Sequence, residues 1–173
     1  MDERTLVVGL GNPILGDDGV GWDVARMVAA RPEVAARSDV DVECLALGGL
    51  SLMEWLIDYE RAIIIDAIQT RGGSPGAIYC APLDAFPNHA AGHTTAAHDT
   101  SLHTALQMGR AMGASLPDDI DVVAIEAPRV YEFREELSPA VAAAVPVAAA
   151  AVLRLLAHPI DDDQDDGRKN VPS

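Results

Sequence analysis

Short apolar runs alternate along the chain with longer stretches whose apolar positions recur at helical spacing. This alternation is typical of a layered α/β domain, in which helices cover the faces of a sheet. The apolar runs predict strands near residues 4–9, 40–46, 61–66, 76–81 and 120–126. The amphipathic stretches predict helices near residues 19–31, 51–58, 100–113 and 138–157.

The segment RAIIIDA, which begins at Arg61, is almost continuously apolar, as expected of a central strand covered on both faces. Only residues 67–76 separate it from the next predicted strand, and this connection is too short for the helical crossover that parallel strands need. The strand near 76–81 is therefore predicted to be antiparallel. Right-handed crossovers place the first strand between the second and the third. We therefore expect a mostly parallel sheet with one antiparallel strand.

The composition fits one globular domain, which we place at residues 1–158, followed by an acidic tail at 159–173 that we expect to be disordered. We expect no apolar run of the length that spans a bilayer, and the start of the chain has no signal-peptide pattern. The prediction is a soluble, cytoplasmic monomer. Cys44 and Cys80 lie in apolar segments and are predicted to be buried thiols.

The formal net charge of −15 narrows the range of partners. Nucleic acids and anionic membranes attract basic surfaces, so neither is expected to bind this chain. Cationic partners are favoured instead.

The stretch LVVGLGNPILGDDGVG, which begins at Leu6, runs from the first strand into a Gly/Asn/Pro turn. Residues 9–18 are here called the opening turn. A nucleotide-binding turn is disfavoured, because Ile14 stands where the dinucleotide fingerprint needs a third glycine and no Walker lysine follows. Asp17 and Asp18 would also repel a phosphate. The turn is better suited to presenting carboxylate groups to a cation.

Ligands of open α/β sheets bind beyond the carboxyl ends of the strands, at the point where the strand order reverses. The predicted topology brings Asn12, Asp17, Asp18 and Asp66 to that edge. Asp18 could instead cap the following helix, and Asp17 is more suitable as a turn residue than as a ligand. Asp66 ends a buried strand, where a carboxylate is costly unless it is solvated, paired or bound to a metal.

The long loop that ends at His98 carries a third kind of metal ligand. His98 precedes Asp99 and Thr100, which are candidate caps of the helix near 100–113, and His93 is an alternative ligand. Two carboxylates and an imidazole suit a divalent metal with open coordination positions. The sequence has neither an HExxH nor a GxSxG motif, so zincin and serine-nucleophile chemistry are disfavoured.

Five segments, in this order, carry a wider similarity: GLGNPILGDDGVG from Gly9, LGGLSLMEWL from Leu47, AIIIDA from Ala62, HTTAAHDTSL from His93, and AIEAPRVYEFREELSPAV from Ala124. Together they resemble the hydrogenase maturation proteases, which trim the C-terminus of the [NiFe]-hydrogenase large subunit. The resemblance implies a three-layer sandwich with a five-stranded, twisted, mostly parallel sheet and helices on both faces. It also implies an endopeptidase of the aspartyl or metal-dependent type.

The resemblance further implies that Asp18, Asp66 and His98 form the catalytic and metal-binding trio. In that family the metal is nickel, which arrives already inserted in the hydrogenase precursor rather than as a resident cofactor, so only a loaded precursor is cleaved. As a hypothesis, Asn12 and the turn from Gly9 to Gly11 shape the site. Further supporting residues are Asp17, His93 and Glu126, the last at the rim beyond the fifth strand.

Three other interpretations remain open from the sequence. The trio could carry nickel in a non-enzymatic maturation chaperone. The GLGNP segment also begins peptidyl-tRNA hydrolases, although their catalytic histidine motif is missing and an acidic surface is unsuited to tRNA. The chain could also be an α/β domain whose acids are caps and whose histidines lie on a surface loop. Within the protease interpretation, His93 and His98 could exchange roles.

Overall fold

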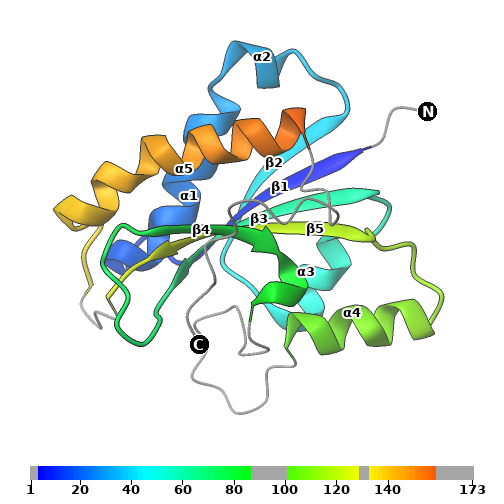
Figure 1. Ribbon diagram of the computed structural model, residues 1–173. Coiled ribbons are helices and arrows are strands. Elements are labelled where there is room, and N and C mark those ends of the chain that lie inside the picture. Colours follow the sequence, from blue (N-terminus) through cyan, green and yellow to red (C-terminus); the bar gives the residue numbers. More distant parts are fainter. Residues whose placement is uncertain (1–3, 87–100, 129–132, 159–173) are drawn as a thin grey trace.

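The computed structural model describes residues 4–86, 101–128 and 133–158 (Figure 1). Its centre is a five-stranded sheet in the order β2-β1-β3-β5-β4. The strands are β1 (Thr5–Leu10), β2 (Val40–Leu45), β3 (Arg61–Ile68), β4 (Ile78–Pro82) and β5 (Asp119–Glu126). Only β4 runs antiparallel to its neighbour, β5, within the described sheet. The predicted antiparallel strand and the predicted position of β1 between β2 and β3 are both confirmed.

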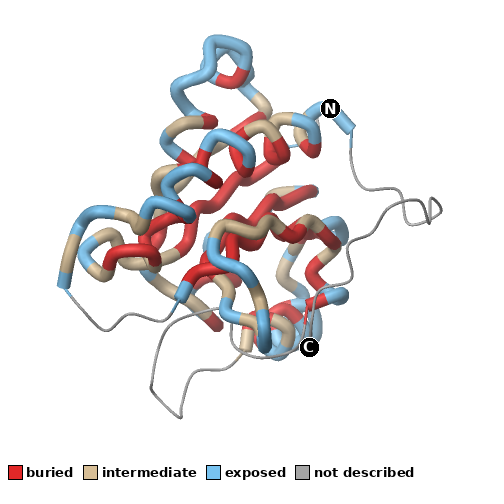
Figure 2. The backbone as a smooth tube through the Cα atoms, turned by 60° about the vertical axis from the view of Figure 1, so that its left-hand side comes forward, coloured by how far each residue is buried: buried red, intermediate tan, exposed pale blue. Residues whose placement is uncertain are grey.

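Helices cover both faces of this sheet, which confirms the three-layer α/β sandwich (Figure 1). The helices are α1 (Val20–Ala29), α2 (Pro32–Ala35), α3 (Gly49–Trp55), α4 (Leu102–Ala111) and α5 (Pro139–Ala157), with short 3-10 turns η1 (Gly16–Gly19) and η2 (Leu83–Ala85). Strand residues alternate between the faces, so Ile63 and Ile65 pack with α1 and α5, whereas Ala62 and Ile64 pack with α3 and α4. Figure 2 shows the resulting buried layer through the sheet.

The helix predicted over residues 19–31 divides into two. The first part, α1, ends at Ala29, and Arg31 is extended with φ −74° and ψ 126° before Pro32 begins α2. A proline disfavours helical conformation in the preceding residue but fits the first position of a new helix. The division was therefore encoded in the sequence at Pro32.

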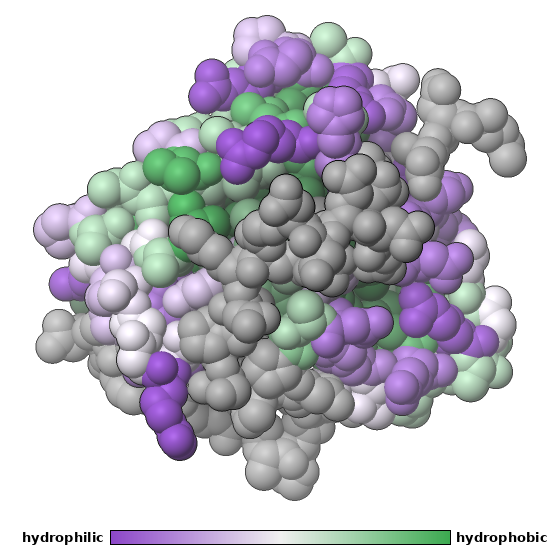
Figure 3. Space-filling model, in the orientation of Figure 1, coloured by the Kyte–Doolittle hydropathy of each residue, from purple (hydrophilic) through white to green (hydrophobic). Residues whose placement is uncertain are grey.

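Helix α5 corrects the expectation that no apolar segment reaches bilayer-spanning length. It is 19 residues long with a mean hydropathy of 2.1, which meets the criterion by length and composition. Half of its apolar window is buried in the protein, where Val141, Ala148 and Val152 pack against the core. Figure 3 shows other apolar side chains at the surface over α5. Val147 is exposed on this helix. Alanines supply much of the hydropathy and permit close packing on the sheet.

The amino end of α1 lies directly against the two central strands. A Cβ atom added to Gly21 would lie 2.3 Å from the carbonyl oxygen of Leu10 and 2.6 Å from that of Ile65. Both neighbours are backbone atoms, which cannot move aside without shifting a strand. A residue without a side chain at position 21 therefore sets the distance between α1 and the ends of β1 and β3.

Replacing Gly21 with alanine should destabilise the protein by about 2 kcal/mol, within the range typical of overpacked cores. Alanine is normally better than glycine inside a helix by about 1 kcal/mol, so a loss would report the backbone clash. Urea denaturation measures the free energy of unfolding. Gly109→Ala is the matched control in α4, because its Cβ would contact the flexible side chains of Leu116 and Met53 and should cost much less. A Gly21→Ala variant as stable as the wild type would contradict this packing argument.

Candidate functional site

The carboxyl ends of β1 and β3 form the edge at which the strand order reverses. Strand β1 is paired with β2 on one side and β3 on the other, so the connection after β1 and the connection after β3 leave toward opposite sides of the sheet. The last residues that β1 and β3 pair with each other are Gly9 and Ile65. The opening turn begins at the first of these, and Asp66 follows the second. The structure thus brings two predicted site segments to one edge, as the topology argument required.

The opening turn is closed by the side chain of Asp18. Its Oδ2 accepts a hydrogen bond of 2.7 Å from the backbone N–H of Asn12, and the Leu15 N–H donates to the Asn12 carbonyl. Gly19, not Asp18, is the N-cap residue of α1, and it makes no side-chain cap. The helix-capping alternative for Asp18 is therefore wrong. Asp18 instead reaches back across the turn, which fixes the orientation of its carboxylate.

The glycines of the opening turn permit backbone segments to approach closely. Gly11 has φ +126°, in the region that favours glycine, and a Cβ there would lie 1.8 Å from the carbonyl oxygen of Asp18. A Cβ on Gly9 would lie 2.3 Å from the carbonyl oxygen of Gly21. Both glycines thus serve to close the turn onto η1 and α1.

Asp66 is buried within β3, which continues to Ile68, two residues past the predicted end of the strand. Its Oδ1 accepts a 2.8 Å hydrogen bond from the Ala67 N–H, and strand alternation places it on the face of the sheet covered by α3 and α4. The η1 turn that contains Asp18 packs against β3. Two carboxylates, each oriented by a backbone N–H, therefore come from separate segments to the same edge.

Asp17 and Asp18 are adjacent in sequence but have different partners. Asp17 is 1% exposed, and its Oδ1 accepts a hydrogen bond from the N–H of Ser138, just before α5. The amino end of a helix is favourable for a carboxylate because its N–H groups carry partial positive charge. Asp17 thus joins the opening turn to α5.

A second contact between the same regions was missed by the sequence analysis. Residues 133–138, here called the strap, run along the opening turn, with Arg134 in a parallel bridge to Leu15. The Gly16 N–H donates to the Arg134 carbonyl at 2.6 Å, and the Arg134 N–H donates to the Ile14 carbonyl at 3.1 Å. An isolated bridge has no periodic pattern that could have predicted it.

Glu126 was expected beyond the fifth strand, but it is the last residue of β5 and is 3% exposed. Its Oε1 accepts from the Thr70 N–H and its Oε2 from the Thr70 hydroxyl, both at 2.8 Å. A Cβ on Gly73 would lie 2.2 Å from the Glu126 carboxyl carbon. Glu126 therefore anchors the connection between β3 and β4.

The predicted imidazole ligands His93 and His98 lie outside the described residues, as do the candidate caps Asp99 and Thr100. Within the described chain, Ser101 caps α4, accepting a hydrogen bond from the Thr104 N–H. No group of three His, Cys, Asp or Glu among the described residues is arranged to hold a metal ion.

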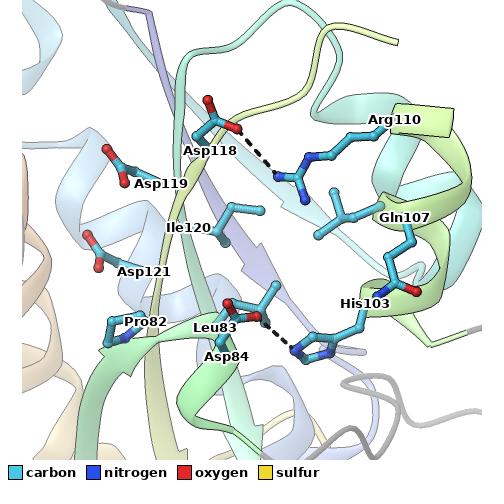
Figure 4. Close-up of a pocket in the computed structure, with 11 residues that line it drawn as sticks. Pro82, Leu83, Asp84, His103, Gln107, Arg110, Asp118, Asp119, Ile120 and Asp121 are labelled. Carbon is cyan, nitrogen blue, oxygen red and sulfur yellow. Dashed lines mark ion pairs between the residues drawn. The ribbon is translucent and has the colours of Figure 1, made fainter. Parts of the chain in front are cut away.

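A separate cavity of about 310 Å³ lies between α4 and the strands β4 and β5 (Figure 4). In it, His103 faces Asp84, with 3.7 Å between Nε2 and Oδ1, and Arg110 faces Asp118. This cavity is lined by the start of β5, so it lies at the opposite edge of the sheet from the opening turn. His103 therefore does not contribute to the two-carboxylate edge.

The two cysteines lie on β2 and β4, the two edge strands of the sheet, so they cannot approach one another. Both thiols were expected to be buried, but both cysteines are only half-buried. Burial raises the pKa of the Cys44 thiol. A raised pKa lowers the thiolate fraction at neutral pH and makes Cys44 a poor nucleophile.

Comparison with known proteins links this architecture to one group. A family model described as hydrogenase maturation protease matches residues 35–155. The hydrogenase expression/formation protein HupD of Rhodobacter capsulatus is 27% identical over 156 residues, which cover 89% of this chain and 71% of HupD. The HupD protein of Rhizobium leguminosarum bv. viciae is 27% identical over 155 residues, covering 88% and 74%.

Among solved structures, the hydrogenase maturating endopeptidase HybD from E. coli superposes with a TM-score of 0.68 at 24% identity, covering 89% of this chain and 92% of that one. A hydrogenase 2 maturation peptidase from a Thaumarchaeota archaeon superposes with a TM-score of 0.62 at 26% identity, covering 89% and 98%. The likeness to HybD establishes a shared fold.

Replacing Glu126 with alanine should destabilise the protein by about 2 kcal/mol, because hydrogen bonds to a buried charged group are each worth roughly 1.5–3 kcal/mol. Urea denaturation measures the loss, and hydrogen exchange at the Thr70 amide should become faster. Glu126→Gln retains an acceptor for that amide and should recover most of the stability. Unchanged exchange at Thr70 in the alanine variant would show that Glu126 does not anchor the connection.

Proposed function

The chain belongs to the hydrogenase maturation protease family, and from that premise we propose that it is a nickel-dependent endopeptidase that removes the C-terminal extension of a [NiFe]-hydrogenase large-subunit precursor after nickel insertion. Family membership makes the protein a hydrolase of the endopeptidase class, with a hydrogenase precursor as substrate. The nickel requirement and the position of the cut are the parts that we propose.

The convergence of Asp18 and Asp66 carries the proposal. Both carboxylates are oriented by a backbone N–H, at 2.7 and 2.8 Å, and both belong to the edge where α/β sheets bind ligands. Carboxylate oxygens bind divalent cations, and imidazole is a common nickel ligand. We propose that His98 supplies the imidazole, with His93 as its alternative.

Nickel in this proposal is cargo of the precursor rather than a resident cofactor. A cation bridging the precursor and the two carboxylates would hold the scissile peptide bond at the edge of the sheet, and such positioning accelerates a reaction strongly. A divalent cation can also polarise a carbonyl group or lower the pKa of a bound water molecule. The protein's own residues would supply the orientation: Asn12 fixes Asp18, and the Ala67 N–H fixes Asp66.

A non-enzymatic nickel carrier and a peptidyl-tRNA hydrolase are both less consistent with the comparisons. The matched family model describes proteases, and the solved structures named above are a peptidase and an endopeptidase. The conclusion is therefore a protease.

The purified protein should remove a C-terminal peptide from a nickel-loaded cognate precursor and leave the nickel-free precursor intact. The reason is that the scissile bond is positioned only when the cation joins the two proteins. Mass spectrometry of both precursors after incubation measures the cleavage. Equal cleavage of both forms would contradict nickel gating, and tight nickel binding without any cleavage would favour the carrier interpretation.

Asp66→Asn should lower the rate of precursor cleavage by more than about a hundredfold. Loss of a residue that only hydrogen-bonds to a metal ligand already costs up to about that much, and Asp66 is proposed to contact the metal itself. The amide can still accept the Ala67 N–H, so the fold should be retained, as thermal unfolding would show. Asp118→Asn is the matched control, because its side chain is 98% exposed at the opposite edge of the sheet. Wild-type processing by Asp66→Asn would refute the assignment of Asp66.

A further inference from the structure

The strap holds the opening turn at two places. One is the backbone bridge between Arg134 and the segment from Ile14 to Gly16, and the other is the hydrogen bond from the Ser138 N–H to the Asp17 carboxylate. The residue after Asp17 is Asp18, the proposed ligand. The strap therefore fixes the chain immediately before that ligand.

We propose that Asp17 is a positioning residue: its bond to the Ser138 N–H ties the amino end of α5 to the opening turn and thereby sets the orientation of the Asp18 carboxylate for precursor cleavage. The inference rests on the proposed function, because it concerns the same reaction. Asp17 itself does not contact the substrate in this scheme.

Burial of the Asp17 carboxylate costs free energy, which a purely structural residue at this position would not need to incur. The side chain is almost completely buried, and only its Oδ1 has a hydrogen-bond partner among the described residues. Oδ2 is buried without one, and so are the Ser138 hydroxyl and the Arg134 Nε. Buried polar atoms without partners destabilise a protein and are concentrated at functional sites. Three such atoms lie here, in the contact between strap and opening turn.

The local backbone converts this contact into an orientation of Asp18. Gly16 has φ +60°, and a Cβ there would lie 3.0 Å from the Arg134 Nε, so the strap lies close against the residue that starts η1. Within the short η1 turn, the Asp17 side chain is directed to Ser138 while the Asp18 side chain is directed to Asn12. A rotation of the η1 turn that broke the first contact would also displace the second.

Ser138 permits the bond to be removed without changing Asp17. Its φ of −63° is that of proline, and its ψ of 152° suits a residue before Pro139. Ser138→Pro therefore keeps the backbone angles and deletes the N–H donor, and its Cδ atom, which replaces the hydrogen, also displaces the Asp17 carboxylate from this position. Ser138→Ala is the matched control, because it keeps the N–H and removes only a hydroxyl that has no partner among the described residues.

The experiment measures kcat and KM for the nickel-loaded precursor. Ser138→Pro and Asp17→Ala should each lower kcat by about tenfold to a hundredfold, as loss of an orienting partner does, with KM changed by less than about twofold. Ser138→Ala should match the wild type. The double variant should be no slower than the slower single variant, because both changes remove the same bond.

Several results would overturn the inference. These are wild-type kcat in folded Ser138→Pro, a rise in KM with kcat unchanged, or losses that multiply in the double variant. If Ser138→Pro does not fold, Asp17→Asn is the deciding variant. It keeps an acceptor for the Ser138 N–H, so it should retain a higher kcat than Asp17→Ala. Equal losses of kcat in the two variants would refute the positioning role of Asp17. A wild-type protein that leaves loaded precursor uncut would overturn both the proposed function and this inference, whereas a cleaving wild type confines any failure to Asp17.

Discussion

The contact between the amino end of α1 and the ends of β1 and β3 determines the geometry of the whole edge. Gly21 lies against the carbonyl groups of Leu10 and Ile65, and no side chain fits between them. This approach forces the chain after β1 to turn back within a few residues, which requires the positive φ of Gly11. Asp18 then faces the backbone of Asn12. The position of the proposed ligand is thus a consequence of backbone packing.

Buried carboxylates near this edge perform different tasks, although the sequence presents them alike. Asp17 joins the turn to α5 through Ser138, and Glu126 holds the connection from β3 to β4 through Thr70. Asp66 is oriented by the next N–H of its own strand. Burying each of these groups costs free energy, which hydrogen bonds from N–H or O–H donors offset. The hydrogen-bond partner of each carboxylate, rather than its burial, therefore distinguishes the anchoring acids Asp17 and Glu126 from the proposed ligand Asp66.

Much of the fold was predictable because it follows from local rules. The short connection after Asp66 required an antiparallel β4. Right-handed crossovers placed β1 between β2 and β3, and the acids at one edge. The strap could not be predicted, because Asp17 and Ser138 are 121 residues apart and no periodicity records their contact. For the same reason Glu126 was assigned to the rim, since its bond to Thr70 depends on how a loop folds back.

The proposed nickel requirement is consistent with the electrostatics of this edge. Asp18 and Asp66 carry like charges in a protein of net charge −15, so the edge attracts a cation and has little affinity for a neutral peptide segment. A precursor that carries a divalent ion supplies the missing positive charge together with the bond to be cut. A precursor without the ion presents only peptide. Recognition of the loaded precursor and neutralisation of the site would then be the same physical event, which requires no separate sensor of nickel insertion.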